Sequence, residues 1–195
     1  MNYRIRMLIV LLVVSLFSGG SLSFMYAHLK RKIEENLRRE LEESLRLLLP
    51  VQKYEVKEWK ERRVYICYDN KGELAGFAIR GKGEGFQGKI DLLLAMDSHG
   101  ERIIGIDILE SQETPGLGAK IDEDWFKSQF RDKTVFPLKL VKMKKSPSPG
   151  TETTTGATIT TAQIEAITGA TISSRAVVNL VNSLVEDLKE FIAQR

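Results

Sequence analysis

The sequence of 195 residues contains one cysteine and two histidines, and this scarcity excludes several kinds of site. The single Cys67 cannot form a disulfide within the chain or supply the cysteine set of an iron–sulfur cluster. His28 and His99 are far apart in the sequence, so no structural zinc site is expected. Because Cys67 lies in an alternating, strand-like run, we expect it to be a packed core residue.

The sequence also lacks the marks of a nucleic-acid-binding protein and of a stand-alone enzyme. The net charge of +3 is slight, and no basic stripe carries interleaved aromatic residues. The glycine-rich residues 81–88 are followed by Lys89 but by no Ser or Thr, so they do not form a phosphate-binding P-loop. No dinucleotide-binding fingerprint is present. We therefore expect no nucleic-acid partner, no catalytic residue and no metal ligand.

One long apolar run lies near the N-terminus. Residues 7–27 contain no charged side chain, and at 1.5 Å per residue they are long enough to cross a hydrocarbon core of roughly 30 Å. A cleaved signal peptide is the alternative, since Arg4 and Arg6 precede the run. The run continues beyond the small residues that would suit a peptidase, which favours a membrane anchor. Basic residues at 30–39 favour a cytoplasmic C-terminal side by the positive-inside rule.

From about residue 53 to 111 the hydrophobic pattern has a period of two, which indicates strands. Asp-Asn-Lys-Gly-Glu at 69–73 and Asp-Ser-His-Gly-Glu at 97–101 are similar units that are typical of tight turns. They predict two hairpins in one antiparallel sheet, with residues 90–96 and 103–109 as core strands. Further predictions are a flexible loop at 81–88, an exposed loop at 142–154, and a short helix at 122–130 anchored by Trp125, Phe126 and Phe130.

The most informative segment is residues 165–174, Glu-Ala-Ile-Thr-Gly-Ala-Thr-Ile-Ser-Ser, because it opens an amphipathic helix. Apolar residues recur at helical spacing behind it: Ala176, Val177, Leu180, Val181, Leu184, Val185, Leu188, Phe191 and Ile192. Ser173 or Ser174 can cap the helix. The first turn of a helix offers unpaired N–H groups and the positive end of the dipole, so an anion beside Thr171 would be stabilised.

Residues 165–171 follow a pattern of an acidic residue, two residues, Ser or Thr, and then Gly-Ala-Thr. This pattern resembles the acceptor sequence of flavin transferases, which join FMN through its phosphate to the final threonine, here Thr171. Residues 152–158 are a second copy that ends at Thr158. No comparable amphipathic helix follows Thr158, so we expect attachment at Thr171.

A second motif, Glu-Ser-Gln-Glu-Thr-Pro-Gly-Leu-Gly-Ala-Lys, occupies residues 110–120. Pro115 and Gly116 force a turn after a strand, and Gly118 lets the backbone approach a flat ligand. With both motifs, the chain resembles the G subunit of the Rnf electron-transport complex and the related C subunit of the sodium-pumping NADH:quinone reductase. The resemblance places Phe86 near the flavin, although packing is an equal alternative. The expected cofactor-binding residues are Glu113, Thr114, Gly116, Leu117, Gly118, Thr168, Gly169, Ala170, Ile172 and Ser173.

Pattern and resemblance together predict an α+β fold, an antiparallel sheet with packed helices, preceded by one transmembrane helix. The expected parts are an N-terminal tail (1–6), a transmembrane helix (7–27), a stalk helix (28–50) and an FMN-binding domain (51–195). The resemblance implies that FMN, joined to Thr171 by a phosphoester, relays electrons between ferredoxin and NAD in an ion-translocating complex. It implies membrane subunits and a flavin transferase as partners. It also places the domain outside the cytoplasm on the inner (plasma) membrane, against the charge count.

Two other functions remain open on the sequence. Glu165 stands where the family pattern begins with Asp, and the motif is duplicated, so the chain is alternatively an unflavinylated, membrane-anchored scaffold subunit. The second alternative is an extracytoplasmic module that binds a phosphate-bearing ligand reversibly at the same helix start. Visible colour that survives acid denaturation would support covalent flavin against both.

Overall fold

The computed structural model describes residues 3–142 and 162–195. Thr158 and nearly all of the predicted loop at 142–154 lie outside the described residues. The chain divides into two compact units, Met1–Glu42 and Glu43–Arg195.

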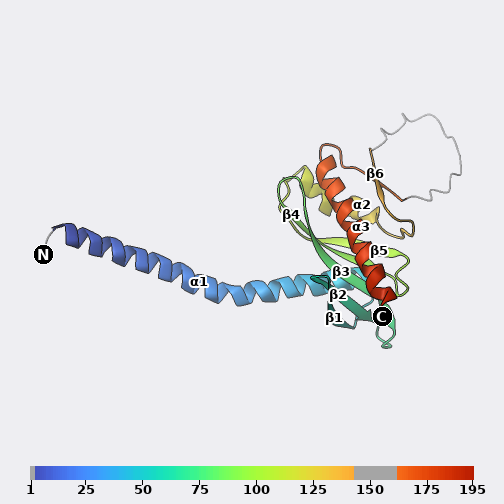
Figure 1. The fold of residues 1–195 in the computed structure, drawn as a ribbon, viewed down its shortest axis with the longest axis horizontal. Coiled ribbons are helices and arrows are strands. Elements are labelled where there is room, and N and C mark those ends of the chain that lie inside the picture. The colour runs from blue at the N-terminus through green and yellow to red at the C-terminus, as the bar shows by residue number, and fades with distance from the viewer. Residues whose placement is uncertain (1–2, 143–161) are drawn as a thin grey trace. The chain divides into compact units, whose positions relative to one another are not determined.

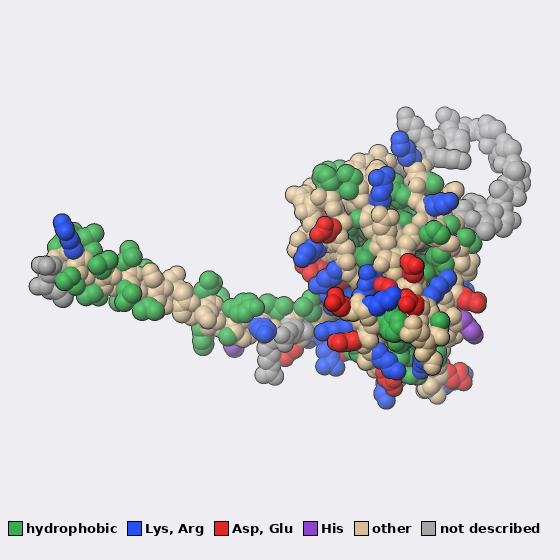
Figure 2. Space-filling view, in the orientation of Figure 1, with side chains coloured by type: hydrophobic (Ala, Val, Ile, Leu, Met, Phe, Trp, Pro, Cys, Tyr) green, Lys and Arg blue, Asp and Glu red, His purple; other side chains and the backbone are tan. Residues whose placement is uncertain are grey.

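Helix α1 spans Tyr3–Leu48 and provides the described part of the first unit. Within the described residues it is the one helix long and apolar enough to cross a membrane, as judged by length and composition alone. The large apolar side chains of its first part, up to Leu37, are exposed, with Leu11 at 68% and Phe17 at 79%, whereas Leu41, Leu45 and Leu48 are buried. Figure 2 shows hydrophobic side chains along most of the helix. Apolar exposure on this scale is rare on soluble monomers and marks contact with lipid or protein.

The second unit is built on a five-stranded sheet in which each strand pairs with the next one along the chain, always antiparallel. The strands are β1 (Lys53–Trp59), β2 (Arg62–Tyr68), β3 (Leu74–Glu84), β4 (Lys89–Met96) and β5 (Ile103–Ser111). Both predicted hairpins are present, and the two predicted core strands correspond to β4 and β5. The α+β class with an antiparallel sheet and packed helices is confirmed.

The two similar turn sequences fold in the same way. Asp69 Oδ1 accepts hydrogen bonds from two backbone amides of its own turn at 2.8 and 2.9 Å. Asp97 Oδ1 does the same after β4, at 2.9 and 3.2 Å. Gly72 and Gly100 have φ values of 79° and 69°, a left-handed conformation that glycine adopts without steric cost. The matched Asp and Gly positions therefore explain both turns.

The prediction of a flexible loop at 81–88 is wrong for its first half, because β3 continues to Glu84. The glycines there serve close packing. A Cβ on Gly81 would lie 2.5 Å from Leu184 Cδ2, and a Cβ on Gly83 would lie 3.1 Å from Leu180 Cδ2. Leu180 and Leu184 belong to the last helix, so the glycines let that helix approach the strand. Only the turn at 85–88 connects β3 to β4.

The helix predicted at 122–130 is shorter and is preceded by a 3₁₀ helix. Helix η1 spans Gly118–Asp122 and α2 spans Asp124–Ser128. Phe126 and Phe130 are fully buried, with ring centroids 5.5 Å apart, and anchor this region as predicted. Trp125 is 38% exposed, so its predicted anchoring role is wrong. A helix of one to two turns presents one face to the core, and Trp125 lies off that face.

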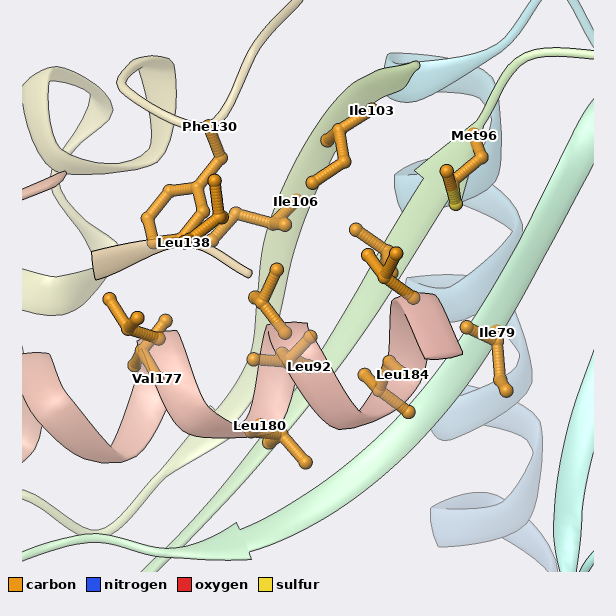
Figure 3. Packing of buried hydrophobic residues seen from close by; sticks show 14 of the residues in the cluster. Ile79, Leu92, Met96, Ile103, Ile106, Phe130, Leu138, Val177, Leu180 and Leu184 are labelled. Atoms are coloured by element: carbon orange, nitrogen blue, oxygen red, sulfur yellow. The ribbon is translucent and has the colours of Figure 1, made fainter. Parts of the chain in front are cut away.

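Helix α3, Thr171–Ala193, crosses one face of the sheet and packs mainly on β3 (Figure 1). In Figure 3 Val177 lies near Leu138, and Leu184 lies toward Ile79 of β3; all belong to one buried cluster that also includes Leu180 and Leu92. Each such side chain stabilises the fold by about 1.5–3 kcal/mol when it leaves water. The predicted amphipathic helix is confirmed: buried on its face are Val177, Val178, Leu180, Val181, Leu184, Val185, Leu188 and Phe191.

A short parallel pair, β6 (Lys139–Val141) and β7 (Gln163–Glu165), holds the chain just before α3. Asn182 of α3 fixes the residue before β6, since its side chain accepts from Leu138 N at 2.8 Å and donates to Leu138 O at 2.9 Å. Cys67 is fully buried in β2, as predicted. Burial raises the pKa of the Cys67 thiol to about 12, so this cysteine is a core residue without ready reactivity.

Candidate functional site

Three segments that are far apart in the sequence line one cavity of about 270 Å³. They are the turn between β3 and β4, the turn after β5, and the start of α3. The lining residues are Phe86, Glu113, Thr114, Leu117, Gly118, Gly169, Ala170, Thr171, Ile172 and Ser173. Of the residues predicted from the two motifs, only Gly116 and Thr168 are not part of this lining, and each is adjacent in the chain to a lining residue.

The segment before α3 forms a tight turn that aims the helix at the cavity. Ala170 N donates to Ile167 O at 3.0 Å, and Gly169 has a φ of 82°, as the third residue of a type II turn requires. Ser174 Oγ accepts from Ile167 N at 3.0 Å and donates to Ala170 O at 2.9 Å. Ser174, which is fully buried, thus ties the turn to the first turn of α3.

The predicted cap by Ser173 or Ser174 is wrong, because the helix begins earlier than a cap at either residue requires. Thr171 is the first residue of α3, Ala170 is the N-cap, and no side chain of the described residues caps it. The amides of residues 171–173 therefore have no partner within the helix. The exposed Thr171 side chain lies beside these donors and on the cavity wall.

Glu113 is the carboxylate at the centre of the site. It is 6% exposed, and its side chain connects all three segments. Oε1 accepts from the backbone amides of Phe86 and Gln87 at 2.6 and 3.1 Å, and Oε2 accepts from Ser173 Oγ at 2.7 Å. Burial by itself raises the pKa of Glu113, but the donors from Ser173, Gln87, Phe86 and Gly88 outweigh it and lower the pKa. Glu113 is consequently ionised at neutral pH.

Two glycines make room for this carboxylate. A Cβ on Gly85 would lie 2.1 Å from Glu113 Oε1, and a Cβ on Gly118 would lie 2.2 Å from Glu113 Oε2. No carbon–oxygen contact of that length is sterically allowed, so both positions require glycine while Glu113 keeps its place. Gly118 Cβ would also meet Ser173 Oγ at 2.8 Å. Gly118 was predicted from its turn motif, whereas Gly85 was not, because its packing against Glu113 is a long-range contact.

The cavity has an apolar rim and a polar link between its two turns. Phe86, Leu117 and Ile172 are 68%, 50% and 54% exposed, although each is a large hydrophobic residue. Thr114 Oγ1 donates to Gln87 Oε1 and so joins the turn after β5 to the turn between β3 and β4. Gln87 was missed by the sequence analysis, and no local pattern marks it. Apolar side chains around a few polar groups are the usual make-up of a small-molecule site.

A family model for the FMN-binding domain matches residues 85–186. The matched range begins at the turn that donates to Glu113 and includes the start of α3, so it covers the whole cavity. The chain belongs to the FMN-binding domain family.

Within this family, the chain is similar to the G subunits of ion-translocating oxidoreductase complexes. The G subunit of the proton-translocating ferredoxin:NAD(+) oxidoreductase complex of Clostridium ljungdahlii is 36% identical over 115 residues, or 59% of this chain and 54% of the relative. The G subunit of the Na(+)-translocating complex of Acetobacterium woodii is 36% identical over 124 residues, or 63% of this chain and 53% of the relative. The chain thus spans about half the length of the curated relatives it matches. The predicted relationship to these G subunits is confirmed.

The fold has a counterpart among solved structures. The crystal structure of Shewanella oneidensis NqrC matches with a TM-score of 0.56 and 24% identity, covering 68% of this chain and 60% of that chain. At this identity the likeness concerns the fold, and it agrees with the antiparallel sheet and packed helices described above.

The residues around the cavity fit FMN in three respects. The start of α3 offers backbone amides to a phosphate, the apolar rim offers contacts to a flat ring, and Gly118 lets the Glu113 carboxylate and Ser173 pack together in the cavity wall. The volume of about 270 Å³ is slightly below the roughly 300–1,000 Å³ of typical small-molecule sites.

Proposed function

We propose that this chain is the flavin-carrying G-type subunit of a membrane-bound, ion-translocating ferredoxin:NAD oxidoreductase, with FMN joined through its phosphate to Thr171. The observation that carries the proposal is the position of Thr171. Thr171 is an exposed residue, is the first residue of α3, and lines the cavity beside amides that lack helical partners. Bound FMN supplies the redox chemistry, and the protein supplies position and retention.

Attachment would be a group transfer without a change of oxidation state. The Thr171 oxygen forms a bond to phosphorus, the bond from phosphorus to the nucleotide leaving group of a flavin dinucleotide breaks, and the hydroxyl proton is released. A flavin transferase, acting as the partner enzyme, would catalyse this step. The amides of residues 171–173 would then stabilise the remaining negative charge of the phosphoester.

The proposed membrane location rests on α1 and on the relatives, which are subunits of ion-translocating complexes. The apolar residues 7–27 are long enough to cross a bilayer, which would make the chain a single-pass subunit that docks on other membrane subunits of its complex. An extracytoplasmic position of the domain gives covalent attachment a purpose, because a flavin that dissociated there would be lost.

Co-expression of the full chain with a flavin transferase tests the attachment site. Wild-type protein should keep its yellow colour through acid precipitation, Thr171→Ala should lose it, and the matched variant Thr158→Ala should keep it. The modified residue is then located by mass spectrometry. Trypsin leaves both threonines on one peptide, since no Lys or Arg lies between residues 146 and 174. A protease that cleaves after glutamate separates them at Glu165.

The outcome distinguishes the proposal from its alternatives. Flavin on the peptide that begins at Ala166 supports attachment at Thr171, and flavin found only on residues 153–165 contradicts it. Colour that is lost on denaturation indicates a reversible binding module. A colourless wild-type protein, expressed with an active transferase, indicates a scaffold subunit.

A further inference from the structure

We propose that Glu113 is a positioning residue whose fixed negative charge in the cavity wall makes the reduction potential of the bound flavin more negative. This inference rests on the proposed function, because it concerns a flavin in the same cavity. Glu113 lines the cavity directly, so any ligand that fills the cavity lies against the wall to which its carboxylate belongs.

The Glu113 carboxylate is held in place and cannot turn away from the cavity wall. Its oxygens are held by Ser173 Oγ at 2.7 Å and by two amides of the turn at 85–88, and Gly85 and Gly118 confine it from two sides. Rotation of the side chain would break these hydrogen bonds and leave a buried carboxylate unsatisfied.

The charge is also not neutralised by a partner. The elements packed against Glu113 present a hydroxyl from α3 and backbone amides from the turn between β3 and β4. Among the described residues no charged side chain forms an ion pair with it, whereas Asp91 in β4 is paired with Arg80 at 2.6 Å. Burial weakens solvent screening, so the field of Glu113 extends into the cavity.

The effect on a flavin follows from charge balance. Full reduction adds two electrons to the ring; when one proton follows, the ring gains one negative charge, and when two follow, it gains none. A fixed negative charge opposes the first outcome and leaves the second nearly unaffected. A unit charge within about 10 Å changes such an equilibrium by more than tenfold at an effective dielectric constant of about 20.

Glu113→Gln is the decisive variant, because it removes the charge and keeps the shape. The amide oxygen can still accept from Phe86 N and Gln87 N, and the amide nitrogen can donate to Ser173 Oγ. Glu113→Asp keeps the charge and serves as the conservative comparison. Glu110→Gln makes the same change of charge three positions earlier, at an exposed residue outside the cavity lining, and is the matched control.

The test is a spectroscopic redox titration of the full, flavin-loaded chain in detergent from pH 6 to 9, against a reference dye. In alkaline solution Glu113→Gln should have a two-electron potential more positive by at least about 30 mV, which is tenfold in the equilibrium. The difference should shrink toward low pH, where the reduced ring takes up the second proton. Glu110→Gln and Glu113→Asp should stay close to wild type.

An unchanged potential in Glu113→Gln, a shift independent of pH, or equal shifts in Glu110→Gln or Glu113→Asp would overturn the inference. Should Glu113→Gln fail to fold, Thr114→Lys places a positive charge on the same wall and must shift the potential in the same direction. Failure of the proposed function looks different, because wild-type protein would then carry no covalent flavin to titrate.

Discussion

Gly118→Ala is the substitution whose effect follows most directly from the geometry of the site. The new Cβ would lie 2.2 Å from Glu113 Oε2 and 2.8 Å from Ser173 Oγ, so the carboxylate must move by about 1 Å or more to reach an allowed contact. That movement breaks the 2.7 Å hydrogen bond from Ser173. Gly118 does not have a positive φ, so the substitution adds no backbone strain.

The expected loss of stability combines two effects. A hydrogen bond to a charged group contributes about 1.5–3 kcal/mol, and overpacking of a well-packed site costs about 1–3 kcal/mol. Alanine gives the unfolded chain less conformational entropy than glycine does, and this offsets about 0.4–1 kcal/mol of the loss. We expect Gly118→Ala to lower the free energy of unfolding by about 1.5–5.5 kcal/mol.

Urea unfolding followed by tryptophan fluorescence measures this loss in the full chain. Trp59 and Trp125 are the two tryptophans and both lie in the second unit, so the signal reports on the domain and not on α1. The control is Gly83→Ala, whose Cβ would meet the flexible end of Leu180 at 3.1 Å. Equal stability losses in the two variants, or a loss below about 1 kcal/mol in Gly118→Ala, would refute the reasoning.

Three further outcomes are expected. The stability difference between wild type and Glu113→Gln should be constant from pH 6 to 8 and shrink below about pH 4. The pKa of Glu113 is lower in the folded chain than in the unfolded chain, where it is near 4.3, so the ionised carboxylate stabilises the fold above that pH and this stabilisation is lost as the pH falls. Urea titrations at each pH check this. Asn182→Ala should cost about 1–3 kcal/mol in the same assay, because it breaks both hydrogen bonds to Leu138. A phosphatase fused after Arg195 should be active outside the cytoplasm, and activity of a cytoplasmic reporter alone would contradict that topology.

The features that could be predicted from the sequence are those with local causes. The Asp and Gly of each hairpin turn interact within a few residues, so their spacing alone indicated both turns. The buried face of α3 follows from helical periodicity. The two motifs brought the residues from Glu113 to Gly118 and from Gly169 to Ser173 into one predicted site, and the structure places these segments around one cavity.

The features that were missed depend on contacts between distant segments. Gly81 and Gly83 resemble a flexible loop in the sequence, and only the approach of α3 shows that they belong to a packed strand. Gln87 carries no local pattern, yet it accepts from Thr114 across the cavity. Ser173 looked like a helix cap, but its hydroxyl donates to Glu113 from the other side of the site. Contacts of this kind, between segments distant in the sequence, cannot be inferred from one sequence alone.

The arrangement of the site separates two properties that the proposed covalent flavin would need. The proposed acceptor, Thr171, depends on a short local segment, in which Ser174 and Gly169 shape the turn before α3. The cavity depends on Glu113, which ties that segment to turns after β3 and β5. Glu113→Gln should therefore change the potential of the flavin more than its attachment, whereas Thr171→Ala should abolish attachment and leave the folded cavity intact. A Glu113 variant that lost attachment while remaining folded would show that the two properties are coupled.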